Sequence, residues 1–293
     1  MRITQSMLSN NMLRNISSSY DQLNTYMDQL STGKKINRPS DDPVIAMKGM
    51  NYRSQATAIE QYKRNTGEVH NWMDNSDAAL DKATQAMQKL RELAVQASNG
   101  TNDTQERESI RKEAEQLKEY LIDIANTKVN DKYIFNGTDT NTKPVTINEA
   151  GELTVPGKTK PVMIEVASGT KLQANVDPSS VFSEGLFQDI DSLLSALGDN
   201  DQSAIEQHID KLDDHINDTI NSRADLGARM NRLDLVENRL GEQEVISKKV
   251  MSDNEDIDYE KVITQLITQE SMHRAALSAG SRIIQPSLVD FLR

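Results

Sequence analysis

Two long stretches without proline, residues 44–143 and 179–285, restrict most strongly what this chain can fold into. Proline inside a helix removes a hydrogen bond and clashes with the preceding turn, so both stretches can be helical throughout. Over about its first 50 residues, from Ile45 to Ala97, the first one keeps a heptad repeat, which would make a helix roughly 80 Å long at a rise of 1.5 Å per residue. One seam of the repeat is Ile45, Tyr52, Ile59, Thr66, Met73, Leu80, Met87 and Ala94, and the other is Lys48, Gln55, Tyr62, Val69, Ser76, Ala83, Leu90 and Ala97.

The beginning of the chain predicts one helix and the start of the next. An amphipathic pattern covers about residues 4–31, and Gly33 follows where a left-handed C-terminal residue is favoured. Asp42 and Pro43 then predict the start of the long heptad helix. A carboxylate accepts hydrogen bonds from the free amides of a first turn, and proline at the first helical position loses no needed hydrogen bond.

The second half of the chain predicts further helices. Asp103 and Ser203 each have a glutamate three residues later, which is the spacing of a capping box and predicts two helix starts. The helix from Ser203 is expected to run to about residue 251. A final helix is expected to begin after Glu255 and to end before Pro286.

The centre of the chain has a different pattern. Four of the seven prolines lie within residues 138–185, between short segments rich in β-branched residues. Such segments, separated by glycine and proline, predict short strands. The segments are residues 144–147, 152–155, 162–166 and 171–176.

These elements predict a mainly α fold, an elongated antiparallel helical rod or coiled coil built from both chain ends, with a small central β-rich insertion. Residues 1–42 and 252–293 are expected to form a terminal coiled-coil assembly domain. Residues 43–137 and 186–251 are expected to form a helical rod domain, and residues 138–185 a small β-rich outer domain.

Composition excludes several functional classes. The net charge of −12 argues against nucleic acid as a partner, because phosphate binding needs a basic surface. The chain has no cysteine, which excludes disulfides and thiolate metal sites. We see no cleavable secretory signal in the first 30 residues and no run of 18 apolar residues for a membrane span. If the protein is secreted, it must use another route.

The sequence contains no arrangement typical of catalysis. His208 and His215 are seven residues apart on one predicted helix, about 10 Å, which is too far to share one metal ion. The acidic segment 253–260 lacks the glycine of a calcium loop, and acidic residues favour a helix start. We therefore expect no enzyme, no cofactor and no metal site.

Three segments resemble one family, in the same order along the chain. Residues 30–43, LSTGKKINRPSDDP, resemble a sequence motif of bacterial flagellins and their hook-associated relative. Residues 90–101, LRELAVQASNGT, resemble a second flagellin segment, and the NRL tripeptides at 231–233 and 238–240 resemble a third. With the terminal helices, the resemblance covers about residues 1–140 and 186–293. It implies a flagellin-like fold.

Two further segments favour one branch of the family. Residues 132–138, KYIFNGT, and the ending SLVDFL at 287–292 are similar to the subunit that joins hook to filament. Residues 271–285 lack the run LAQAN that is typical of filament flagellins. The resemblance therefore implies a junction subunit that seeds flagellin polymerisation; a filament flagellin stays as the alternative. A generic coiled-coil scaffold would not explain the matching boxes at both ends.

The resemblance also implies partners and a location. Members of this family leave the cell through the flagellar type III export channel without a cleaved signal, and become part of the extracellular flagellum. The expected partners are further copies of the chain in a ring, the first hook-associated protein, flagellin and an export chaperone at the C-terminal helix. The expected assembly interface is Met12, Ile16, Leu23, Met27, Leu30, Leu266, Leu277, Leu288 and Phe291.

The sequence gives two further expectations, one about the terminal helices and one about a surface of the rod. Isolated helices are marginal in water, so we expect the terminal segments to be disordered in the monomer and to fold only between subunits. Lys89, Leu93 and Glu113 lie in the stretch that resembles the flagellin surface read by host innate receptors.

Overall fold

The computed structural model describes residues 5–99, 103–147, 153–155, 157 and 159–284. The chain divides into two compact units. We call residues 1–58 with 243–293 the terminal unit and residues 59–242 the rod unit. The helices are α1 (Gln5–Thr32), α2 (Pro43–Ser98), α3 (Thr104–Ala125), the 3-10 turn η1 (Pro178–Ser180), α4 (Glu184–Asp199), α5 (Gln202–Glu255) and α6 (Tyr259–Ile284).

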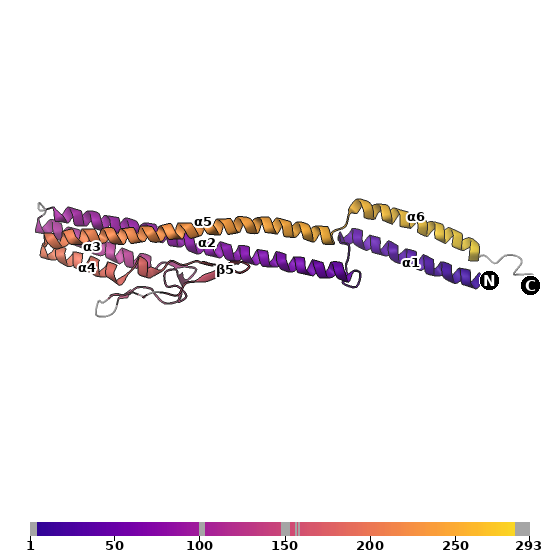
Figure 1. Cartoon of the computed structure of the whole chain (residues 1–293), viewed down its shortest axis with the longest axis horizontal. Helices are drawn as coiled ribbons and strands as arrows, with labels where there is room; N and C mark the ends of the chain where they lie inside the picture. The colour runs from indigo at the N-terminus through magenta and orange to yellow at the C-terminus, as the bar shows by residue number, and fades with distance from the viewer. Residues whose placement is uncertain (1–4, 100–102, 148–152, 156, 158, 285–293) are drawn as a thin grey trace, which may run out of the picture. The chain divides into compact units, whose positions relative to one another are not determined.

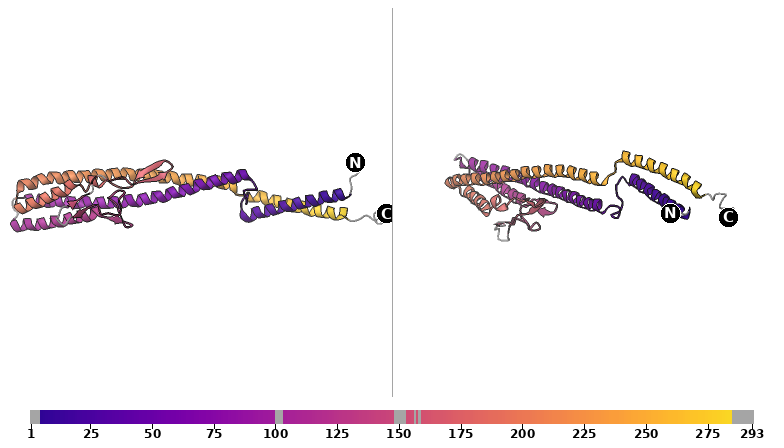
Figure 2. Two further views of the ribbon diagram at one scale, coloured as in Figure 1. Left: turned by 90° about the horizontal axis from the view of Figure 1, so that it is seen from below. Right: turned by 45° about the vertical axis from the view of Figure 1, so that its right-hand side comes forward.

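The rod unit is a helical bundle built on parts of α2 and α5. Figures 1 and 2 show α3 and α4 lying beside these two long helices. The heptad seam of α2 is confirmed here, since Met73, Leu80, Met87 and Leu90 are fully buried. On α5, Leu212, Leu226, Leu233 and Leu240 are all buried against the same core.

The β-rich insertion is part of the rod unit and packs against its helices. Within residues 138–185, β3 (Thr146–Ile147) pairs antiparallel with β4 (Leu153–Thr154), and β5 (Met163–Ala167) with β6 (Thr170–Gln173). A further antiparallel pair, β1 (Lys128–Val129) with β2 (Lys132–Tyr133), comes just before the insertion. The Asn65 side chain of α2 donates a 2.7 Å hydrogen bond to the Glu165 carbonyl of β5. Phe135 and Phe182 meet edge to face inside the core, with ring centroids 5.2 Å apart. The prediction of a mainly α fold with small strands in the middle is confirmed.

The terminal unit contains an antiparallel pair of helices, α1 and α6, which run side by side in Figures 1 and 2. The Gln269 side chain donates a 3.1 Å hydrogen bond to the Ser19 hydroxyl. A Cβ added at Gly280 would lie 2.5 Å from the end of the Met12 side chain, so this glycine permits the close approach. Residues facing the partner helix recur at heptad spacing and are half-buried or buried: Ser9, Met12, Ile16, Ser19, Leu23, Tyr26 and Leu30 on α1, and Val262, Leu266, Gln269, His273, Ala276 and Gly280 on α6.

Most predicted helix ends are confirmed. Gly33 adopts the left-handed conformation with φ of 71°, and Asp42 accepts hydrogen bonds from the amides of Val44 and Ile45. The Asp103 amide donates to the Glu106 side chain at 3.1 Å, as a capping box requires.

Two predicted ends are wrong. The helix expected to start with Ser203 as its cap begins one residue earlier, and the side chain of Asp201 caps it by accepting from the Ala204 amide at 3.1 Å. Asp201 is an equally good cap, and α4 ends only two residues before it. The same helix continues to Glu255 instead of ending near residue 251. The first acidic residues of the segment 253–260 therefore end α5, whereas we expected them to start the final helix.

No described helix is both long enough and apolar enough to cross a membrane.

Candidate assembly surface of the terminal unit

The terminal unit exposes an unusual share of its apolar side chains. Among the described residues, Ile257 and Val262 are its only buried hydrophobic side chains, and all the others belong to the rod unit. Large apolar side chains that would be core residues elsewhere face solvent on all of its helices. They are Met7, Leu8, Leu13, Tyr20, Met27, Val44, Met47, Met50, Val245, Ile246, Val250, Tyr259, Ile263, Ile267, Met272 and Leu277.

The predicted interface residues fall on two different faces of the α1–α6 pair. Five of them are half-buried in the seam between the two helices: Met12, Ile16, Leu23, Leu30 and Leu266. Met27 and Leu277 instead point outward and are 59% and 48% exposed. Leu288 and Phe291 lie outside the described residues. The outward residues are thus the ones that this chain leaves available for another molecule.

Sequence reasoning did not assign several outward residues to the interface. On α1, Leu13 and Tyr20 precede Met27 at intervals of seven residues, so the three side chains share one face. On α6, Ile263 and Ile267 follow Tyr259 at intervals of four. The sequence does show a second apolar stripe beside the first on these helices. It does not show which of the two stripes faces the partner helix and which faces outward.

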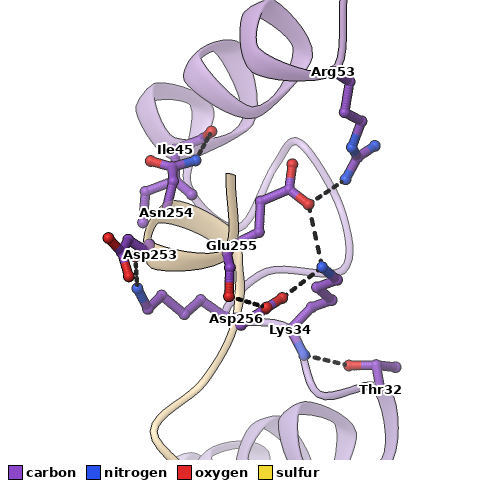
Figure 3. Close-up of polar contacts among 10 residues, drawn as sticks. Thr32, Lys34, Ile45, Arg53, Asp253, Asn254, Glu255 and Asp256 are labelled. Atoms are coloured by element: carbon purple, nitrogen blue, oxygen red, sulfur yellow. Dashed lines mark hydrogen bonds and ion pairs between the residues drawn. The ribbon is translucent and has the colours of Figure 1, made fainter. Parts of the chain in front are cut away.

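A polar junction connects the ends of the helices within the terminal unit (Figure 3). The segment after α1 pairs with the segment after α5 as a short antiparallel bridge. In that bridge the Lys35 amide donates to the Glu255 carbonyl at 2.7 Å, and the Ile257 amide donates to the Gly33 carbonyl at 3.0 Å. The Lys34 ammonium lies 2.6 Å from Asp256 and 3.4 Å from Glu255.

The carboxylates of this junction need those cations. Glu255 is the last residue of α5 and Asp256 follows it, at the end of the helix where the dipole disfavours negative charge. Glu255 is 4% exposed, and its Oε2 accepts a hydrogen bond from Arg53 at 2.8 Å. The positive charges of Lys34 and Arg53 therefore stabilise these carboxylates, which the helix end cannot do.

Hydrogen bonds shift the ionisation of the exposed members of the junction. Those from Lys34 and Ser252 lower the pKa of Asp256, and the same contact with Asp256 raises the pKa of Lys34. A carboxylate with a lowered pKa stabilises the folded state above its ordinary pKa. This contribution is lost as the pH falls through the lowered value.

One glycine makes room for the buried carboxylate. A Cβ at Gly49 would lie 2.4 Å from Oε1 of Glu255, well inside van der Waals contact. Glycine normally weakens a helix interior by about 1 kcal/mol relative to alanine. Its presence in α2 is explained by the space that Glu255 occupies.

The loop between α1 and α2 is held by its own aspartates. The Asp41 carboxylate accepts from the backbone amides of Asn37 and Arg38 at 3.1 and 2.9 Å, and these bonds lower its pKa. Asp42 caps α2. Three residues of the segment LSTGKKINRPSDDP therefore have structural roles at this junction. Gly33 makes a left-handed turn, Lys34 supplies a cation at the end of α5, and Asp42 caps α2.

The other residues singled out in the sequence lie in the rod unit. His215 contacts the Asp189 carboxylate at 3.0 Å, beside Lys211, while burial lowers the pKa of His208. Lys89 pairs with Glu92, and Leu93 is buried in the core.

The comparisons with known proteins agree with this architecture. Residues 3–140 match the model of the bacterial flagellin N-terminal helical region, and residues 209–292 match that of the C-terminal helical region. Flagellar hook-associated protein 3 of Escherichia coli (strain K12) is 27% identical over 304 residues, which cover 95% of this chain and 96% of that protein. Flagellin of Bacillus subtilis (strain 168) is 25% identical over 298 residues, 94% of each chain.

A solved structure gives the same fold. The crystal structure of flagellar hook-associated protein 3 from Legionella pneumophila superposes with a TM-score of 0.64 at 15% identity, and covers 70% of this chain and 98% of that one. The two matched helical regions flank the insertion, as the flagellin-like arrangement requires. The chain belongs to the bacterial flagellin family and resembles hook-associated protein 3 over nearly its whole length.

Proposed function

We propose that this chain is the structural subunit that joins the hook of the bacterial flagellum to its filament and seeds the polymerisation of flagellin. The observation that carries the proposal is the outward apolar surface of the terminal unit, which has a solvent-exposed row on α1 and another on α6. Apolar patches of this extent mark surfaces that other proteins cover. Similarity to hook-associated protein 3 across 95% of the chain supports the position at the junction.

The occupants of this surface are further copies of the chain and its flagellar neighbours. In this arrangement the terminal helices pack subunit against subunit as an inner layer of a ring. The first hook-associated protein lies on the hook side and flagellin on the filament side. The nine interface residues named from the sequence, including Leu288 and Phe291, belong to this layer. The outward ones, Met27 and Leu277, make contacts between subunits, and the seam residues hold α1 against α6.

The rest of the chain lies outside the inner layer of terminal helices. Residues 43–137 and 186–251 form the rod layer, and residues 138–185 form the outer domain. Before assembly the subunit leaves the cell through the flagellar type III export channel without cleavage of a signal, and a cytoplasmic chaperone covers the C-terminal helix. A chaperone at this place would keep the apolar face of α6 from aggregating.

The second candidate function is that of a filament flagellin. Identity of 25% to Bacillus subtilis flagellin over 94% of this chain favours it. The two functions place the chain differently in the same organelle, because a junction subunit occupies one short zone while a flagellin occupies the whole filament.

Immunogold electron microscopy of intact flagella separates the two positions. Antibodies are raised against a peptide from the β5–β6 hairpin, whose turn at Gly169 is exposed. We expect gold particles in a single zone where the curved hook meets the filament. Labelling along the whole filament would show a flagellin instead, and labelling confined to the cell body would contradict both functions.

A further inference from the structure

Four ionisable side chains of the rod unit gather between α2 and α5. His70 and Asp74 lie one turn apart on α2, and Asp234 and Glu237 lie three residues apart on α5, so each pair shares one face of its helix. The Nδ1 atom of His70 is 4.0 Å from Oδ1 of Asp234. One ligand atom each from His70, Asp234 and Glu237 lies within 4.8 Å of the other two.

The environment of His70 directs one ring nitrogen toward the carboxylates of α5. Its Nε2 lies 3.4 Å from Oδ2 of Asp74. An acidic neighbour at Nε2 favours the tautomer that carries its proton there, which leaves the lone pair on Nδ1. Metal-bound histidines are commonly oriented in this way, with the second nitrogen donating to a carboxylate.

The Nδ1 atom itself is buried and has no hydrogen-bond partner among the residues that the structure describes. A buried polar atom without a partner is costly. A cation held jointly with Asp234 and Glu237 would satisfy it and would also neutralise the two neighbouring carboxylates.

We propose that His70, Asp234 and Glu237 bind one divalent transition-metal ion, with Zn²⁺ as the best fit, and that Asp74 positions His70. Imidazole with two carboxylates suits zinc, whereas Ca²⁺ and Mg²⁺ prefer oxygen ligands alone. Two atoms that bind one zinc ion at about 2.1 Å lie at most about 4.2 Å apart. Small rotations of the exposed carboxylates close the remaining gap, and water completes a tetrahedral site.

The ion would fasten α2 to α5 inside the rod unit, between residues far apart in sequence. The metal site belongs to the rod unit and the assembly surface to the terminal unit. A test of the metal site is therefore independent of the junction function. A ligand that binds only the folded state stabilises it by RT ln(1 + [L]/Kd), so the melting temperature keeps rising with ligand concentration.

Isothermal titration of the purified, tag-free full chain with zinc chloride tests the proposal. After removal of metals with a chelator, we expect the unchanged chain to bind zinc and its melting temperature to rise by roughly 5 °C at a hundredfold excess over the dissociation constant. The double variant Asp234→Asn/Glu237→Gln keeps the side-chain shapes and should bind zinc at least about 10-fold more weakly. Calcium chloride should produce no comparable heat.

The matched control is Asp218→Asn/Glu242→Gln, which removes the same two charges from exposed positions of the same helix. It should bind zinc like the unchanged chain. Equal affinity of all three chains would overturn the proposal, because the zinc would then be bound elsewhere, for example at His208 or His215. Absence of zinc binding by the unchanged chain would overturn it as well.

Discussion

Replacing Leu277 with aspartate should abolish incorporation of the subunit into the flagellum and leave the stability of the rod unit unchanged. Leu277 is 48% exposed on α6, so a carboxylate there costs the isolated chain little. Once another subunit covers the position, the same carboxylate loses its water without gaining a partner, which costs several kcal/mol per contact. The measurement is motility with electron microscopy of a strain that carries only this variant, alongside thermal unfolding of the purified protein.

Two controls show whether the position and the chemistry both matter. Leu277→Met preserves an apolar side chain of similar volume and should support normal filaments. Leu235→Asp makes the same chemical change on the rod unit, at a leucine that is 71% exposed, and should be tolerated. Normal filaments on Leu277→Asp subunits, or equal loss with Leu235→Asp, would contradict the assignment of assembly to the terminal helices.

Exchanging Gly49 for alanine should have opposite effects in two backgrounds. In the unchanged chain the new Cβ would meet Oε1 of Glu255 at 2.4 Å and force the buried carboxylate away from Arg53. We expect the junction to lose about 1–3 kcal/mol, the cost of an unsatisfied buried acceptor. In a Glu255→Ala background the clash disappears, and alanine should stabilise the helix by up to about 1 kcal/mol.

Hydrogen exchange at the Lys35 and Ile257 amides reports this effect directly, since both amides form the antiparallel bridge of the junction. The matched control is Gly67→Ala in the same helix. Among the described residues, no atom beyond the adjoining helix backbone lies within 4 Å of a Cβ at that glycine, so the change should be favourable in both backgrounds. If Gly49→Ala slows exchange without the Glu255 change, the glycine is not there to accommodate the carboxylate.

Local sequence patterns predicted the buried stripe of α2 and most helix ends, because interactions between residues close in sequence determine these features. The heptad of α2 specified which side chains are buried from Thr66 onward, because a helix that long must cover one continuous stripe. The segment 30–43 predicted both helix ends around it through Gly33 and Asp42. The capping residue of α5 was missed because Asp201 and Ser203 satisfy the same chemical rule, and only the short connection from α4 decides between them.

Features that depend on pairing between distant residues could not be predicted in the same way. The stripe on α1 did not show that Met12 faces α6 while Met27 faces outward, because that depends on how the two helices are rotated about their axes. The acidic residues after position 252 had a plausible local role at a helix start. Their pairing with Lys34 and Arg53 requires contacts across more than two hundred residues of sequence.

Deletion of the gene in its source bacterium, with flagellin measured in the spent medium and hooks counted by electron microscopy, tests the junction function most directly. The account predicts bare hooks together with abundant flagellin in the medium, because filament subunits would still be exported but would have no surface on which to polymerise. Bare hooks without flagellin in the medium would contradict it and identify the chain as the filament protein. Normal filaments would contradict both.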